Sequence, residues 1–141
     1  MFALQRRRYG CISSASARMQ SMTMTSSRIT YDDFAKVDIR VGRVLEVQPF
    51  PKARNPSWKV RVDLGDLGEK WSSAQITNYT AEQLVGSLVV CVCNFAPRNI
   101  AGFMSEILIL GAPDADGKII LLSPRKDDAS LDIVAPGTKV Y

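Results

Sequence analysis

The sequence predicts an all-β fold, a five-stranded Greek-key barrel with one short helix and a C-terminal strand extension. Three observations support this fold class. Apolar or alternating segments of strand length recur between turn residues from about residue 37 onward. A capping-box motif, Thr80-Ala81-Glu82-Gln83, lies after the third segment and before the fourth. Three strands, a helix and two further strands form the element order of an OB-fold.

The size and composition of the chain are those of a single globular domain. It has 141 residues, of which 46% are hydrophobic, and this is enough for one core without cross-links. No apolar run approaches the roughly 20 residues of a membrane-spanning helix. We therefore expect no membrane partner.

The positive charge of the chain is concentrated at its head. The formal charge is +4, but residues 1–30 contain five arginines and no acid. The rest of the chain therefore holds 13 of the 18 basic residues and all 14 acidic ones. An RNA site in the folded part must come from local clustering of basic side chains, because bulk charge does not provide it.

The head, residues 1–30, combines its arginines with many hydroxyl side chains. This composition is typical of an organellar transit peptide, mitochondrial before plastid. A disordered basic tail on a cytoplasmic protein, or a true start at Met19, Met22 or Met24, remains an open alternative. In each case we expect residues 1–30 to be disordered and residues 31–141 to form the domain.

The first two strands follow a short helical turn at residues 32–36. Val37 to Val47 alternates, and its apolar phase shifts at Gly42, which predicts a bulge or a sharp coil there. Trp58 to Leu64 alternates apolar with charged residues and is the clearest half-buried strand. The Gly65-Asp66-Leu67-Gly68 segment then forms a turn.

The third strand is predicted over Lys70 to Ile76 and is followed by the capped helix. Leu88 to Cys93 and Ser105 to Leu110 supply the fourth and fifth strands. The residues between these two strands form a loop, which Pro97 stiffens and Gly102 allows to turn.

The C-terminal extension begins after the Asp114-Ala115-Asp116-Gly117 turn. Lys118 to Ser123 is another apolar strand, and residues 132–137 and 139–141 complete the chain. A five-stranded barrel does not require this extension. The apolar side chains of residues 119–122 must nevertheless be buried, and a partner subunit is a natural place for them.

Nothing in the sequence points to an enzyme. Histidine is absent, which excludes Ser-His and Cys-His catalysis and histidine-ligated metals. Cys91 and Cys93 lie two apart on one strand, a spacing that disfavours a disulfide, and we expect them to be core residues. We therefore predict no catalytic residue, no metal site and no cofactor.

Four ordered blocks of sequence resemble one known family. They are Asp38-Ile39-Arg40-Val41-Gly42-Arg43-Val44, Phe50-Pro51-Lys52-Ala53-Arg54, Ser72-Ser73-Ala74-Gln75-Ile76 and the stretch from Asn94 to Gly111. Together they resemble the tRNA-binding domain family, small OB-folds that occur as free dimers and as appendices of methionyl- and tyrosyl-tRNA synthetases. The resemblance covers residues 31–141.

The CsaA-type branch of that family fits best. Synthetase appendices usually carry His-Pro-x-Ala-Asp where this chain has Phe50 to Arg54, and Val-Ser-Gly-Ile where it has Ser72 to Ile76. The His and Asp side chains of the synthetase motif are absent here, so no contact that they make is expected for this chain. The resemblance implies a homodimer that binds structured tRNA. A synthetase or an unfolded peptide is an open candidate for a further partner.

Basic and polar side chains fall where OB-folds bind oligonucleotides, on the second and third strands and the flanking loops. As a group they predict a phosphate-contacting surface for tRNA. The predicted RNA contacts are Arg40, Lys52, Arg54, Lys59, Arg61, Ser72, Ser73, Asn94, Arg98 and Ser105.

A second function stays open. CsaA-type proteins are also described as chaperones linked to protein export, which bind unfolded peptide. Phe95, Ile100, Phe103 and Met104 in the central loop could form an apolar peptide site. The two functions differ in what the loop presents, Arg98 to RNA or Phe103 and Met104 to peptide.

Overall fold

The computed structural model describes residues 26–125 and 134–141. Most of the predicted disordered head, with its transit peptide and internal start sites, lies outside these residues, as do residues 132 and 133 of the predicted C-terminal segment. The chain divides into two compact units, Met1–Phe34 and Ala35–Tyr141. Among the described residues, no helix has the length and apolar character needed to cross a membrane.

The first unit contains the start of the predicted helical turn, α2 (Tyr31–Ala35). Thr30 begins it with reciprocal hydrogen bonds. The N–H of Asp33 donates to the Thr30 hydroxyl at 3.1 Å, and the N–H of Thr30 donates to the Asp33 carboxylate at 3.0 Å. This exchange satisfies two backbone donors that the turn itself cannot.

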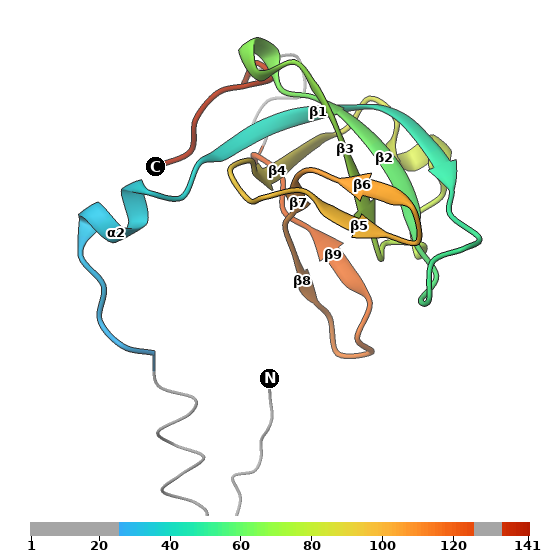
Figure 1. The fold of residues 1–141 in the computed structure, drawn as a ribbon. Helices are drawn as coiled ribbons and strands as arrows, with labels where there is room; N and C mark the ends of the chain where they lie inside the picture. The colour runs from blue at the N-terminus through green and yellow to red at the C-terminus, as the bar shows by residue number, and fades with distance from the viewer. Residues whose placement is uncertain (1–25, 126–133) are drawn as a thin grey trace, which may run out of the picture. The chain divides into compact units, whose positions relative to one another are not determined.

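The second unit is a nearly closed, five-stranded antiparallel barrel, and it confirms the predicted OB-fold. Its strands follow the spatial order β3-β2-β1-β4-β7 (Figure 1). Their bounds are β1 (Ile39–Pro49), β2 (Trp58–Asp63), β3 (Glu69–Ala74), β4 (Leu88–Val92) and β7 (Leu108–Ile109).

Alternation along the strands builds the core. Val60, Val62 and Leu64 of the β2 segment are fully buried, as the sequence predicts. The helix α3 (Ala81–Leu84) carries the predicted capping box and contributes the buried Leu84. The turn before β3 is a single 3₁₀ turn, η3 (Gly65–Leu67).

Gly42 does not mark a bulge, contrary to the sequence-based expectation. The irregularity in the β1–β2 pairing lies further on, between Val44 and Glu46. A Cβ atom at residue 42 would lie 2.3 Å from Cγ1 of Val62 and 2.9 Å from Cδ2 of Leu64. Glycine is therefore required because β1 coils closely over the core side chains of β2.

One hairpin replaces what the sequence indicated as loop. The predicted loop between the fourth and fifth strands contains β5 (Arg98–Ile100) and β6 (Phe103–Ser105). Ala101 and Gly102 join them with φ of 50° and 86°, the positive values of a tight hairpin turn. The predicted fifth strand is therefore split between β6 and β7.

The C-terminal extension forms a second hairpin and an edge contact. β8 (Gly111–Pro113) pairs with β9 (Ile119–Leu121), which projects from the barrel (Figure 1). The last residues run beside the first half of β1, where the N–H of Gly137 donates to the carbonyl of Val41 at 2.7 Å. The N–H of Val140 likewise donates to the carbonyl of Ile39 at 2.8 Å. The tail thus covers an edge of β1 that β2 leaves open.

The barrel closes between β3 and residues 105–107, largely through side chains. The Ser72 hydroxyl donates to the carbonyl of Ile107 at 2.9 Å, and the N–H of Ser73 donates to the Ser105 hydroxyl at 3.1 Å. Glu106 adds two further hydrogen bonds between these segments. Its N–H donates to the Trp71 carbonyl at 2.8 Å, and its carboxylate accepts from the Trp71 N–H at 3.0 Å.

We predict that Ser72→Ala lowers the free energy of unfolding by about 1–3 kcal/mol, because it leaves a buried carbonyl without its donor. Ser72 is 1% exposed. The neighbouring Ser73→Ala is the matched control, since the Ser73 side chain is half-exposed, and it should change stability by less than about 0.5 kcal/mol. Urea denaturation of both variants measures the difference. Equal losses would contradict the role given to Ser72.

Candidate nucleic-acid interface

The outer face of β1, β2 and β3 presents three rows of cross-strand neighbours. Alternate residues of each strand point away from the core, so directly paired residues share this face. The rows are Gln48–Lys59–Ser73, Glu46–Arg61–Trp71 and Arg43–Asp63–Glu69.

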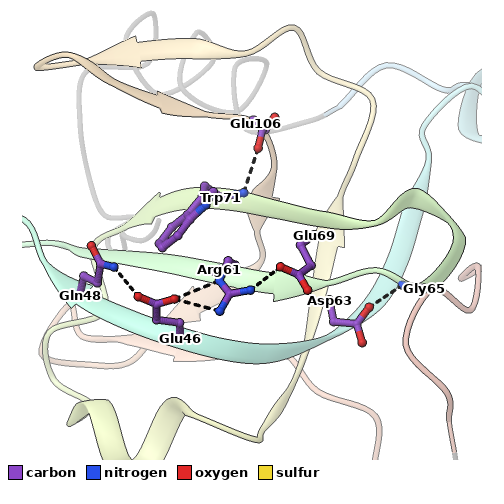
Figure 2. Close-up of polar contacts among 8 residues, drawn as sticks. All are labelled: Glu46, Gln48, Arg61, Asp63, Gly65, Glu69, Trp71 and Glu106. Atoms are coloured by element: carbon purple, nitrogen blue, oxygen red, sulfur yellow. Dashed lines mark hydrogen bonds and ion pairs between the residues drawn. The ribbon is translucent and has the colours of Figure 1, made fainter.

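Arg61, in the middle row, is held by two carboxylates (Figure 2). Its Nη2 lies 2.9 Å from Oε1 of Glu46, and its Nη1 pairs with Glu69. The side-chain amide of Gln48 donates to the other oxygen of Glu46. The hydrogen bonds from Gln48 and from Arg61 lower the pKa of Glu46, and those to Glu69 and Glu46 raise the pKa of Arg61.

Lys59, in the first row, rests on aromatic rings. Its Nζ lies 4.9 Å from the ring centroid of Phe50 and 5.0 Å from that of Phe103. The Phe103 ring meets both Phe50 and Trp71 edge-on, at centroid distances of 5.3 and 5.9 Å. These cation–π contacts fix the ammonium at the end of the face nearest the β1–β2 loop.

Arg54 and Arg98 line one groove of about 470 Å³, together with Ser73. Arg54 comes from the β1–β2 loop and Arg98 from β5. Within residues 26–125 and 134–141, neither guanidinium makes a hydrogen bond or an ion pair, and the same holds for the ammonium of the exposed Lys52. Polar and apolar side chains complete the lining, among them Asn55, Ser57, Gln75, Ile76, Ile100 and Ile119.

A second cleft of about 450 Å³ shares Ser73, Arg98, Ile100 and Leu108 with the first. Its lining is mainly apolar, and it includes Phe95, whose side chain is 58% exposed. Arg98 therefore lies between a cationic groove and an apolar cleft.

Three predicted RNA contacts instead make structural hydrogen bonds. Ser72 and Ser105 close the barrel. The Asn94 amide accepts from the N–H of Asp38 at 3.0 Å and donates to the carbonyl of Lys36 at 2.7 Å. Short polar side chains at strand ends often satisfy backbone groups in this way. These polar groups are thus engaged within the protein, and their positions are explained without RNA.

Arg40 and Arg61 are likewise engaged within the protein. The Arg40 guanidinium pairs with Asp38 at 2.9 Å and donates to the carbonyl of Gly137 at 3.1 Å, which ties the C-terminal tail to β1. The structure thus brings together Arg54, Ser73 and Arg98, with Lys59 paired to Ser73 across the sheet. Ser105 lies beside this group, because it bonds to Ser73 and pairs with Arg98. Lys52 belongs to the same loop as Arg54, two residues before it.

Sequence reasoning missed the carboxylates that surround Arg61 and the groove residues Asn55 and Gln75. The cross-strand register would have revealed Glu46 and Glu69, but a register requires the bulge of β1 to be placed correctly. Gln75 lies within the Ser72 to Ile76 block that carries the family resemblance, which was a usable signal.

Cys91 lies in the core and Cys93 packs against it, as predicted. Burial is the main cause that raises the pKa of Cys91 to about 12, and it also raises that of Cys93. Both thiols are free. Within the described part of the chain, no group of histidine, cysteine, aspartate or glutamate could hold a metal ion.

A family model described as "Putative tRNA binding domain" matches residues 39–130. The chain is 40% identical over 112 residues to the methionine–tRNA ligase of Porphyromonas gingivalis, a match that covers 79% of the chain. It spans only 15% of the length of that ligase.

Two solved structures are similar over their whole length. The CsaA chaperone protein of Picrophilus torridus is 45% identical with a TM-score of 0.73, and the match covers 81% of this chain and 100% of that one. The chaperone CsaA of Bacillus anthracis is 39% identical with a TM-score of 0.71, and the match covers 82% of this chain and 100% of that one.

Proposed function

The chain belongs to the tRNA-binding domain family, and on that premise we propose that it binds structured tRNA through the RNA backbone without catalysing a reaction. The observation that carries the proposal is the groove lined by Arg54 and Arg98. Both guanidinium groups lack a partner within the described residues, so their donors are available to phosphate oxygens. Lys52, two residues before Arg54, and Lys59, which pairs with Ser73 of the groove, add further positive charge.

Contact with the backbone of a folded RNA fits this surface better than stacking on single-stranded bases. Proteins that bind single strands usually display several exposed aromatic side chains. Here Trp71 and Phe103 are half-buried, and they pack against each other beside Lys59. Structured RNA is recognised mostly by shape and phosphate contacts, which cations at fixed positions provide.

We predict that Arg98→Ala weakens tRNA binding by about 1–3 kcal/mol, the range for a lost charge-assisted hydrogen bond. The salt dependence should also become shallower: the negative slope of log affinity against log salt should lose about 0.9 of its magnitude, because one phosphate contact is lost. Titration of the full-length chain with total tRNA across salt concentrations measures both. Lys118→Ala, in the β8–β9 turn, removes the same charge elsewhere and should change neither by as much.

The second candidate function is binding of unfolded peptide, as a chaperone does. An aggregation assay with an unfolded protein, run beside the tRNA titration, tests it. The similar CsaA structures bear the name chaperone, and the apolar cleft beside Arg98 contains the exposed Phe95. Failure to bind tRNA at low salt, combined with suppression of aggregation, would favour peptide binding.

For the Arg98→Ala variant, an unchanged affinity for tRNA at low salt would remove Arg98 from the site.

We also propose that the chain forms a homodimer through the β8–β9 hairpin. Along β9 the side chains of Ile119 and Leu121 pack against the core. Ile120 and Leu122 point the other way and are 46% and 45% exposed. Covering these adjacent apolar side chains with a second copy would remove them from water.

The paired substitution Ile120→Asp and Leu122→Asp is expected to convert a dimer to a monomer, because it would place charges in an apolar interface. Size-exclusion chromatography with light scattering measures the mass directly. Val85→Asp is the control, since Val85 is 49% exposed and lies next to α3. A natural chain that is already monomeric at micromolar concentration would contradict the proposal.

We further propose that residues 1–30 direct the chain to mitochondria, and that a synthetase is a further partner there. The head contains five arginines and no acid, as mitochondrial leaders do. A fluorescent protein fused to residues 1–30 should accumulate in mitochondria. The same fusion with Arg6, Arg7 and Arg8 changed to Glu should remain in the cytoplasm. Plastid or cytoplasmic fluorescence of the natural fusion would contradict this location.

A further inference from the structure

We propose that Glu46 and Glu69 are specificity-determining residues that exclude the RNA backbone from the middle of the outer sheet face. They would thereby confine tRNA to the groove between Arg54 and Arg98. The inference rests on the proposed tRNA binding and assigns a function to two acidic residues that this function does not itself require.

The geometry of Arg61 is the first support. Its Nε and Nη2 lie 3.0 and 2.9 Å from the same oxygen of Glu46, and Nη1 pairs with Glu69 on the opposite side. Figure 2 shows the guanidinium between the two carboxylates. The side chains are 29% exposed for Arg61, 37% for Glu46 and 52% for Glu69. Two partly exposed carboxylates therefore flank the only cation of the middle row.

The second support is the cost that a phosphate would meet at Arg61. Nε, Nη1 and Nη2 of Arg61 each already face a carboxylate oxygen. A phosphate would therefore either share the guanidinium with both carboxylates or displace one of them, replacing one charge-assisted bond with another. In either case a carboxylate would stay close to the phosphate, and like charges repel. The lowered pKa of Glu46 keeps this carboxylate ionised at neutral pH.

The third support is the charge pattern across the face. The formal charge is +1 for the Gln48–Lys59–Ser73 row, zero for the Glu46–Arg61–Trp71 row and −1 for the Arg43–Asp63–Glu69 row. Positive charge therefore increases toward Lys59, whose row ends at Ser73, a residue of the groove lined by Arg54 and Arg98. A polyanion on this face would be drawn to that end and repelled from the other.

The test is the double variant Glu46→Gln and Glu69→Gln in the full-length chain. Glutamine has nearly the same shape but removes both negative charges, so Arg61 becomes available to phosphate. We expect tRNA binding at low salt to tighten roughly ten-fold, as for one gained charge-assisted bond. The salt slope should steepen by about 0.9. The control is Glu82→Gln with Asp116→Asn, which removes two exposed acids from other parts of the barrel unit.

Arg61→Gln distinguishes this mechanism from a general change in charge. Added to the double variant, it should abolish the gain, and in the natural chain it should leave the salt slope unchanged. If Arg61→Gln alone makes the salt dependence of tRNA binding shallower than that of the natural chain, Arg61 already contacts phosphate and the inference is overturned. A double variant that binds no more tightly than the control also overturns it.

Failure of the inference and failure of the proposed function give different results. If the natural chain binds tRNA and loses affinity with Arg98→Ala, the proposed function stands whatever Glu46 and Glu69 do. If the natural chain binds no tRNA at low salt, both are contradicted. Should the double variant not fold, Glu69→Gln alone changes the more exposed carboxylate, and absence of any gain then counts against the inference.

Discussion

The hydrogen bonds that close the barrel between β3 and residues 105–107 position the rest of the candidate site. The Ser72 hydroxyl and the Ser105 hydroxyl make bonds that a regular strand ladder would otherwise supply. Ser105 ends β6, and the register of the hairpin pairs it with Arg98. The contact that closes the barrel therefore also holds Arg98 beside Ser73 at the end of the sheet.

The cations of the barrel unit differ in what they can still bind. Arg40 and Arg61 satisfy carboxylates and carbonyls of the protein, and they stabilise the tail and the sheet face. Arg54 and Arg98 have no such partner among the described residues. Ion pairs of this partly exposed kind contribute little to stability, but they decide which positive groups a phosphate can reach. A near-neutral domain can thus present one local cationic groove.

Local patterns were sufficient for most of the fold. Alternation predicted β2, and the capping box at Thr80 predicted α3. The Ala101–Gly102 hairpin was missed because alanine gives no signal of the positive φ that it adopts there. The bulge was misplaced because glycine serves close packing as well as bulges, and only the neighbouring side chains of Val62 and Leu64 distinguish the two.

By itself, the sequence determined the barrel, its element order, and the region in which basic and polar side chains gather, because these follow from periodicity and turn residues. Only the tertiary structure decided which of those side chains remain available. Whether Ser72 or Arg61 can meet a ligand depends on partners 35 residues away at Ile107 and across the strand at Glu46. The polar groups themselves carry no mark of this in one dimension, since the same hydroxyl or guanidinium serves a buried carbonyl, a carboxylate or a phosphate equally well.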